Sequence, residues 1–171
     1  MAGILPVTFE NDKIYFLLSR ETKDVKHRDS GKWSDFGGSI EKGETLKQTA
    51  IREGHEESCG ILGGEKRIKK LIEENLVNNY RVNNFTTFVV EINNMNKEKR
   101  KKMTKKFRKK YTDVLNNKNK KHLIFEHNGL YEKDMIRWVE ISNIHQFYPK
   151  LRHWYRYVLK TVVNDFKKKY Q

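Results

Sequence analysis

The sequence contains one cysteine, Cys59, and no apolar run that approaches the roughly 20 residues of a membrane-spanning helix. A single cysteine excludes an internal disulfide framework and is typical of proteins in reducing compartments. The first residues also lack the basic start and the long apolar stretch of a secretion signal. We therefore expect a cytoplasmic protein with no membrane association and no disulfide partner.

The composition does not suit a disordered chain or a chain of several domains. Aromatic residues make up 12% of the 171 residues, which is more than disordered segments carry. A chain of this length suits one compact domain and buries a sizeable core without metal or disulfide support. We expect a single domain that spans residues 1–171.

Positive charge is unevenly distributed along the chain, whose formal net charge is +14. Residues 95–121 hold 13 lysines and arginines against 2 acidic residues, and residues 150–171 hold 7 against 1. These two segments carry all of the excess, which favours a polyanionic partner. A solvated, lysine-rich surface without a partner is the alternative that composition leaves open.

The hydrophobic pattern mixes strands and helices, which predicts an α+β fold. Runs of β-branched and aromatic residues predict strands at 4–9, 13–19, 84–92 and 136–141. A helix is expected from Glu44 or Thr45 to Ser58, with Gly60 as its stop.

The two basic segments have apolar residues at helical spacing. In 95–121 they are Met103, Phe107, Tyr111, Val114 and Leu115, which predicts a basic amphipathic helix inserted between strands. In 150–171 the spacing predicts a second basic amphipathic helix, with Pro149 near its first turn. Trp154 and Phe166 lie on its apolar stripe and are expected in the core.

Three glutamates, Glu53, Glu56 and Glu57, fall at i, i+3 and i+4 of the expected acidic helix and so share one face. Carboxylates this close repel one another, and a multivalent cation removes the repulsion. Oxygen ligands without a cysteine–histidine cluster favour Mg²⁺ or Mn²⁺. Arg52 is placed to hold a neighbouring carboxylate, for which Glu44 is the expected partner. A solvent-facing, glutamate-rich helix without a ligand is the alternative.

The loop before this helix contains Gly37 and Gly38, which let the backbone approach a metal ion or a phosphate closely. The helix N-terminus that follows favours anions. Loop and helix together provide a phosphate site beside a metal site, which is what hydrolysis of a phosphoanhydride requires.

The stretch from Gly37 to Gly60 resembles the Nudix hydrolase box. That pattern, a glycine, a glutamate, Arg-Glu and Glu-Glu at fixed spacing, is matched by Gly38, Glu44, Arg52, Glu53, Glu56 and Glu57. Gly54 stands where an aliphatic residue is usual, and Cys59 stands where the closing glycine is expected. Since every acidic position is intact, we expect an active enzyme.

The resemblance implies a Nudix fold, with a mixed β-sheet core between helices. It also implies that water attacks a nucleoside diphosphate linked to another group, with Mg²⁺ or Mn²⁺ as cofactor. Glu53 and Glu57 would be the main metal ligands, with Glu56 assisting and the carbonyl of Gly37 or Gly38 completing the site. Carboxylates turned away from one another, or a lysine where the ion belongs, would contradict this interpretation.

Two further roles follow from the resemblance. Glu44 would orient Arg52 and the helix. Many Nudix enzymes also use a carboxylate from a distant loop as base or additional ligand, for which Glu126 and Glu132 are the candidates, followed by Asp134.

The Nudix box predicts the reaction but not the group attached to the diphosphate. The basic segments make the chain similar to Nudix decapping enzymes, including those of large DNA viruses, which would act in the host cytoplasm. We therefore expect capped RNA, with basic side chains on its phosphates and aromatic rings on its methylated guanine. The candidate substrate-binding residues are Arg20, Trp33, Tyr80, Phe85, Lys101, Lys102, Lys105, Lys106 and Tyr131.

Three alternatives to capped RNA remain open from the sequence. Inositol pyrophosphates are compact and strongly anionic, so they also require lysine and arginine. Free nucleotides or dinucleotides would give the positive charge no role. A Nudix-fold module that binds RNA or a protein without catalysis belongs to a different functional class.

Overall fold

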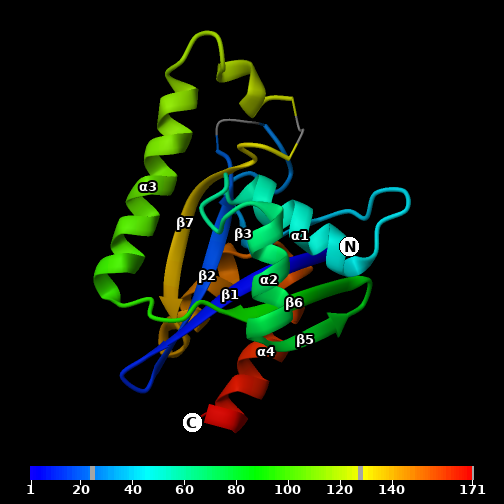
Figure 1. The fold of residues 1–171 in the computed structure, drawn as a ribbon, viewed down its shortest axis with the longest axis vertical. Coiled ribbons are helices and arrows are strands. Elements are labelled where there is room, and N and C mark those ends of the chain that lie inside the picture. Colours follow the sequence, from blue (N-terminus) through cyan, green and yellow to red (C-terminus); the bar gives the residue numbers. More distant parts are fainter. Residues whose placement is uncertain (24–25, 127–128, 171) are drawn as a thin grey trace.

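The computed structural model describes residues 1–23, 26–126 and 129–170, and its centre is a seven-stranded β-sheet (Figure 1). The strands are β1 (Ala2–Glu10), β2 (Lys13–Glu21), β3 (Trp33–Ser34), β4 (Phe36–Gly38), β5 (Leu76–Val82), β6 (Phe85–Glu91) and β7 (Lys133–Glu140). The helices are α1 (Leu46–Glu57), α2 (Glu65–Asn75), α3 (Lys97–Leu115) and α4 (Tyr155–Tyr170), with 3₁₀ helices η1 (Lys121–Ile124) and η2 (Ile141–Lys150).

β1 lies in the middle of the sheet and pairs with three other strands. It runs antiparallel to β2 and β4 and parallel to β6. On one side β2 pairs with β3 and β7, and on the other β6 pairs with β5, all antiparallel. The β1–β6 pair makes the sheet mixed, as the sequence predicted.

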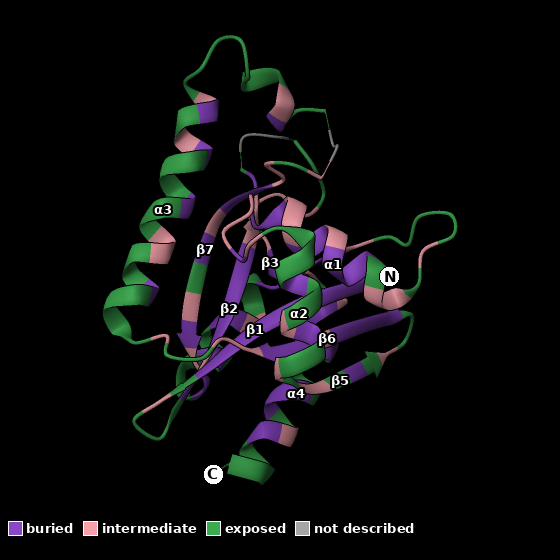
Figure 2. Cartoon of the chain, viewed as in Figure 1, coloured by how far each residue is buried: buried purple, intermediate pink, exposed green. Residues whose placement is uncertain are grey.

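Two hydrophobic cores lie on opposite faces of this sheet. Successive residues of β1, Ile4 and Leu5, belong to different cores because side chains alternate along a strand. Ala50 of α1 and Ile68 of α2 complete the core on one face, and Val158 of α4 packs on the other. Figure 2 shows the strands mostly buried between these layers. The predicted α+β class is confirmed, and no described helix is long and apolar enough to cross a membrane.

α1 begins where the sequence predicted and ends one residue early. Thr45 is its N-cap, and Ser58 is its C-cap. Cys59 and Gly60 then adopt left-handed backbone angles, with φ of 50° and 69°, which an α-helix does not accommodate. The closing glycine of the Nudix pattern is thus replaced by a cysteine in the conformation that glycine favours.

The unusual Gly54 has a packing role. A Cβ atom at this position would lie 2.8 Å from Cγ2 of Ile4 on β1. Glycine therefore lets α1 approach the sheet closely at this point, which offsets its poor helix propensity.

Other boundaries differ from the sequence prediction for identifiable reasons. Neither α2 nor β5 was predicted from the sequence, although the apolar residues of α2, Ile68, Leu71 and Ile72, lie at helical spacing. The helix predicted in 95–121 occupies Lys97–Leu115. Pro149 lies inside η2, and α4 begins only at Tyr155, while Gln171 falls outside the described residues.

Candidate active site

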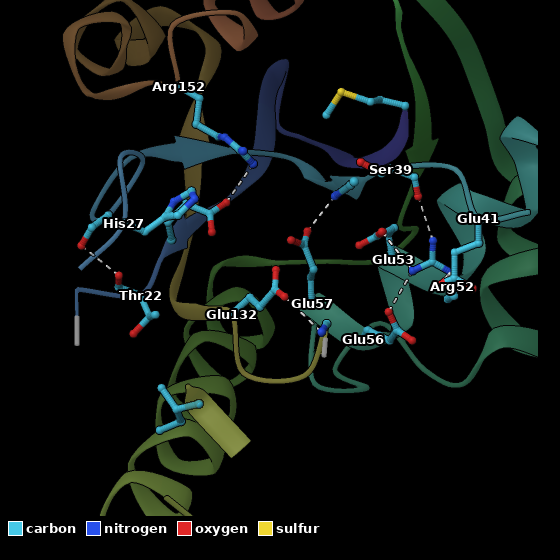
Figure 3. Close-up of a pocket in the computed structure, with 17 residues that line it drawn as sticks. Thr22, His27, Ser39, Glu41, Arg52, Glu53, Glu56, Glu57, Glu132 and Arg152 are labelled. Carbon is cyan, nitrogen blue, oxygen red and sulfur yellow. Dashed lines mark hydrogen bonds and ion pairs between the residues drawn. The ribbon is translucent and has the colours of Figure 1, made fainter. Parts of the chain in front are cut away.

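A cavity of about 460 Å³ opens where α1, the loop after β4 and the segments before β7 and α4 meet (Figure 3). Its acidic lining residues are Glu21, Glu41, Glu53, Glu56, Glu57 and Glu132. The basic side chains on its wall are those of His27, Arg52 and Arg152. Acidic groups therefore outnumber basic ones, so a phosphate anion would enter this cavity only with additional positive charge.

A capping box fixes the start of α1 and with it the direction of the acidic side chains. The hydroxyl of Thr45 accepts a hydrogen bond from the Gln48 amide at 3.2 Å, and the Gln48 side chain accepts one from the Thr45 amide at 2.8 Å. A helix that starts at this position turns Glu53, Glu56 and Glu57 towards the cavity.

Arg52 ties the carboxylates of α1 to the loop that precedes it. Its Nε and Nη2 donate to the two oxygens of Glu44 at 2.8 and 3.1 Å, and Nη2 also donates to the Ser39 carbonyl at 3.0 Å. Its Nη1 donates to Glu53 at 3.0 Å and to Glu56 at 3.1 Å. The hydrogen bonds from Arg52 lower the pKa of Glu44 to about 2, so this carboxylate stays ionised and anchors the guanidinium.

The two glycines after β3 bring backbone directly against the acidic groups. The amide of Gly37 donates to Glu57 Oε2 at 2.6 Å. A Cβ atom on Gly38 would lie 2.4 Å from Glu53 Oε1, and one on Gly37 would lie 2.5 Å from the Cα of Gly3. Only glycine allows so close an approach at these positions.

A lysine lies beneath the acidic wall. Lys133, the first residue of β7, is 0% exposed, and its ammonium contacts Glu57 Oε1 at 3.0 Å and Glu21. From the other side, Arg152 contacts Glu21 at 3.1 Å and Asp29 at 3.0 Å. Each buried charge in this network therefore has an opposite charge beside it, as burial requires.

Burial shifts the pKa values of the groups on this wall. It raises the pKa of the Glu53 carboxyl, against the opposing effect of Arg52. It raises the pKa of Glu57 well above its ordinary value, and Lys133 opposes that rise. Burial alone would lower the pKa of Lys133, but Glu57 and Glu21 raise it, so the ammonium stays charged. Perturbed groups gathered around one cavity are typical of functional sites.

The glutamates do not form the metal cage that the sequence predicted. Within residues 1–23, 26–126 and 129–170, no three acidic, histidine or cysteine side chains converge so as to hold a metal ion. Arg52 bridges Glu53 and Glu56, and Lys133 holds Glu57. The reason is charge, because closely spaced carboxylates are stabilised by the nearest cations, and here two side chains provide them.

The lysine that would count against a metal site is thus present, but among the three glutamates of α1 it contacts Glu57 alone. It does not line the cavity, whereas Glu53, Glu56 and Glu132 do. These carboxylate oxygens, next to the exposed backbone of Gly38, are of the kind that Mg²⁺ and Mn²⁺ prefer. The donor set therefore fits a hard divalent ion in its chemistry.

Comparison with known proteins decides the family. The family model described as "NUDIX domain" matches residues 2–162. The chain belongs to the Nudix family. The predicted resemblance and the predicted class, a Nudix hydrolase that acts on phosphoanhydride bonds, are confirmed at that level.

Individual relatives are more distant or match only in part. A 60-residue segment is 47% identical to an uncharacterised protein of Acanthamoeba polyphaga mimivirus and covers 34% of this chain but only 19% of that relative. The Nudix hydrolase RenU of M. smegmatis is 13% identical with a TM-score of 0.51, over 99% of this chain and 86% of that one. A bifunctional NMN adenylyltransferase/ADP ribose pyrophosphatase of Francisella tularensis was solved with AMP and a Mn ion. It is 13% identical with a TM-score of 0.55, over 96% of this chain and 41% of that one. Identities this low show a shared Nudix fold alone.

The structure distinguishes the three distant carboxylates proposed for the Nudix site. Glu132 lines the cavity, and its side chain accepts a hydrogen bond from the Gly129 amide at 3.1 Å. Glu126 lies outside the cavity lining and faces His122 at 3.7 Å. Asp134 is buried and accepts from Arg20 Nε at 2.7 Å. Glu132 is therefore the one of the three that remains a candidate.

The salt bridge between Arg20 and Asp134 explains why Arg20 does not reach the cavity. The guanidinium of Arg20 lies 5.8 Å from the centre of the Trp33 ring. The prediction that Arg20 binds substrate is not supported, because its charge is already paired inside the protein.

Three of the four predicted aromatic stackers lie in the core, which contradicts their prediction as stackers. Trp33 packs edge-on against Phe147 at 5.4 Å, and Phe85 packs on Trp154 at 4.6 Å, both in the core under α4. Tyr80 lies in the same core. These side chains point to the face of the sheet opposite α1, which strand alternation decides and composition does not reveal.

The remaining aromatic candidate, Tyr131, is half-buried but lies elsewhere. It lines a separate cavity, of about 430 Å³, with Cys59 and Lys110. No phenylalanine, tyrosine or tryptophan is among the described residues that line the acidic cavity, where the imidazole of His27 is the aromatic ring present.

A second hollow, of about 830 Å³, lies between α3 and the strands β2 and β7. We call it the cationic groove, and its basic residues are Lys13, Lys97, Arg100, Lys101, Lys105, Arg108 and Arg137. Tyr15 and Trp138 also line it, and its acidic residue, Glu10, is paired with Arg100 at 2.7 Å. Two of the predicted lysines, Lys101 and Lys105, therefore face the groove, whereas the exposed Lys102 and Lys106 do not line it.

Three charged residues and one histidine of the site were not predicted from the sequence: Glu21, Lys133, Arg152 and His27. No local motif marks them, because they come together only through long-range pairing. The register of β2 with β7 places Glu21 directly opposite Lys133. A charged residue at the end of each strand is a signal only when that register is known.

Proposed function

We propose that this Nudix hydrolase removes the methylated guanosine cap of messenger RNA. In this reaction water attacks the phosphate bridge, a phosphoanhydride bond breaks, and methylated guanosine diphosphate and RNA with a 5′ monophosphate leave. The observation that carries the proposal is the cationic groove along α3, which has the chemistry of a binding site for single-stranded nucleic acid.

Two hydrogen bonds connect α3 with segments at the cavity. Arg108, on the groove wall, donates from Nη1 to the carbonyl of Asp134 at 3.0 Å, two residues beyond Glu132. The hydroxyl of Tyr111, further along α3, is hydrogen-bonded to that of Thr22, which lines the cavity. α3 therefore lines the groove and contacts Thr22 of the cavity wall, although none of its own residues lines the cavity. An RNA strand held along α3 would have its 5′ end at the acidic residues.

The groove combines the two interactions that single strands need. Lysine and arginine side chains would neutralise phosphates, and the rings of Tyr15 and Trp138 would contact bases or sugars. The guanidinium of Arg100 already lies 3.8 Å from the centre of the Tyr15 ring, so cation and aromatic ring form one surface.

The acidic residues would hold a divalent ion, Mg²⁺ or Mn²⁺. By the match to the Nudix box, Glu53, Glu56 and Glu57 are its proposed ligands, with the carbonyl of Gly37 or Gly38. When bound, such an ion polarises a phosphate and lowers the pKa of water. The Mn ion in the Francisella tularensis relative supports this assignment.

The chain's own residues would position substrate and move a proton. Arg52 stays anchored by Glu44 and Ser39 and keeps its Nη1 directed at the carboxylates of α1. Glu132 comes from the segment before β7, and its carboxylate would accept the proton of the attacking water. Arg152, on the cavity wall, would contact a phosphate oxygen of the bridge.

The second candidate substrate is a free nucleotide derivative such as ADP-ribose. It is favoured by the lack of phenylalanine, tyrosine and tryptophan among the described residues lining the cavity, which leaves a cap base no aromatic pair there. Inositol pyrophosphates fit less well, because a wall with six carboxylates repels so dense an anion.

We place the activity in the cytoplasm, where capped messages are found.

The test is incubation of RNA with a labelled cap, in Mg²⁺, beside ADP-ribose and a dinucleoside polyphosphate. We expect release of methylated guanosine diphosphate from the RNA. Rapid turnover of ADP-ribose with the cap left intact would replace decapping by the second candidate.

A further inference from the structure

The basic helix α3 also builds a third hydrophobic core, which is separate from the two cores on the sheet. Its buried residues are Tyr111 and Val114 of α3 and Ile124 of η1, and Leu115 and Tyr131 pack half-buried against them. Ile124 also lines the acidic cavity. The basic insertion therefore reaches the cavity with apolar residues as well as offering charge to a polyanion.

The third core holds the residue that precedes Glu132. Tyr131 has a φ of 62°, in the left-handed region that tyrosine rarely adopts. Such a backbone persists only where its surroundings hold it, and for Tyr131 they include this core. Gly129 lies so close to α1 that a Cβ atom there would be 2.4 Å from Glu56 Oε2. The direction of the Glu132 carboxylate therefore depends on how the residues before it are seated.

Tyr111 is connected to the same segment by hydrogen bonds. It is 0% exposed, and its hydroxyl is hydrogen-bonded to that of Thr22, which directly follows β2. The amide of Thr22 in turn donates to the carbonyl of Glu132 at 2.8 Å. Tyr111 thus reaches Glu132 by two routes, through Thr22 and through the core that holds Tyr131.

We propose that Tyr111 is a positioning residue for Glu132, the proposed proton acceptor. It acts through Thr22 and Tyr131, and it does not itself line the cavity. This inference rests on the proposed function and deepens it, because the basic insertion then sets the geometry of a carboxylate at the reaction as well as holding RNA. Its contribution is the same for a substrate with an RNA strand and for one without.

The test compares kcat and KM of Tyr111→Phe with those of the wild type, on capped RNA and on ADP-ribose in Mg²⁺. The substitution keeps the ring in the core and removes the hydroxyl that holds Thr22. We expect kcat to fall about tenfold on each substrate that the wild type hydrolyses, with KM within about twofold, because a misplaced proton acceptor slows the chemical step and leaves binding intact. Unchanged kcat, or a rise in KM alone, would overturn the inference.

A second variant breaks the same hydrogen bond from its other partner. Thr22→Val removes the hydroxyl, keeps the size of the side chain and leaves the backbone amide that bonds Glu132. We expect the same fall in kcat, and no further fall when Thr22→Val is combined with Tyr111→Phe, because both substitutions remove one interaction. Two losses that multiply in the double variant would show that the residues act separately and would overturn the shared route.

Tyr80→Phe is the matched control for a loss of stability. The Tyr80 hydroxyl donates to Asp165 of α4, on the face of the sheet opposite α1. Like Tyr111→Phe, this variant removes one tyrosine hydroxyl and its hydrogen bond, and urea denaturation measures what that costs in each. We expect Tyr80→Phe to keep the kcat of the wild type. A similar fall in kcat there would mean that turnover follows stability, which overturns the inference.

Failure of the inference and failure of the proposed function are distinguishable. If Tyr111→Phe and Thr22→Val decap RNA with the kcat of the wild type, the inference falls and decapping stands. If the wild type hydrolyses ADP-ribose and leaves the cap intact, decapping falls and kcat on ADP-ribose decides the inference. If Glu132→Gln keeps the kcat of the wild type, Glu132 is not the proton acceptor and the inference falls with that role. Hydrolysis of neither substrate would remove both.

Discussion

At the scale of single residues, the three glutamates of α1 are not equivalent, although the sequence pattern presents them as one group. Glu57 is buried and held by Lys133, whereas Glu56 is partly exposed at the cavity and contacts Arg52. Removing the charge of Glu57 therefore disturbs a buried ion pair, and removing that of Glu56 does not.

We expect Glu56→Gln to reduce turnover at least about 100-fold with little change in stability, because it removes a charge that the reaction needs and no buried partner. Glu57→Gln should reduce turnover and also lower the free energy of unfolding by about 3 kcal/mol, because Lys133 loses a counter-charge. Turnover and urea denaturation of both variants check this. Equal stabilities would contradict the account of Lys133.

The sequence predicted local relations among these residues and missed the distant ones. The pairing of Arg52 with Glu44 follows from their spacing around a helix start, and the structure shows it. Lys133 and Glu21 meet only because β2 and β7 pair in one particular register. Similarly, nothing in the composition indicates that Tyr80 and Phe85 point away from the cavity.

At the scale of elements, the short turn from β3 to β4 connects the site to the core. It contains Asp35, whose side chain is fully buried and accepts a hydrogen bond from the Thr87 hydroxyl at 2.7 Å. Asp35 Oδ1 has no hydrogen-bond partner among the described residues. Burial raises the pKa of Asp35 to about 7, so the carboxyl binds a proton in the folded chain at pH values where the unfolded chain releases it.

Because the folded state holds a proton on Asp35 that the unfolded state has released, the free energy of unfolding falls as pH rises, here between about pH 4 and pH 7. We expect Asp35→Asn to remove this loss and to be more stable than the wild type at pH 8 by up to about 4 kcal/mol, with little gain at pH 4. Urea denaturation at both pH values measures the difference. The same pH dependence in both proteins would show that Asp35 is not the group responsible.

Most elements with strong local patterns were predictable, and some were missed. The strands around β1 and the helix α1 were predicted within a few residues, because β-branched runs and caps mark them. α2 was missed although its apolar residues lie at helical spacing, and η2 replaces the first turns of the predicted C-terminal helix, since Pro149 lies within it. The face to which each strand directs its side chains depends on sheet pairing, which a single sequence does not show.

At the scale of the whole molecule, the positive charge is organised rather than dispersed. α3 packs along β7 (Figure 1). The cationic groove lies between α3 and the strands β2 and β7. The acidic cavity lies beyond one end of α3, so a polyanion meets attraction along the groove and requires metal ions at the cavity.

We expect Lys101→Ala with Lys105→Ala to weaken binding of capped RNA and to reduce the slope of log affinity against log salt by about 1.4, as for two lost phosphate contacts on a single strand. Fluorescence anisotropy at several salt concentrations, in a Glu56→Gln background that prevents turnover, measures the slope. Lys66→Ala with Lys70→Ala removes the same charge from α2 and should leave the slope unchanged. Equal slopes in all proteins would remove the groove from RNA binding.

The central claim is that the acidic cavity beside α1 hydrolyses a phosphoanhydride bond. Its most direct test is mass spectrometry of the products formed in Mg²⁺ from capped RNA and a panel of nucleoside diphosphate derivatives, with Glu56→Gln as the matched control. The account predicts that the wild type splits at least one of these substrates within its phosphate bridge and that the variant leaves it intact. Cleavage by both proteins, or by neither, would contradict it.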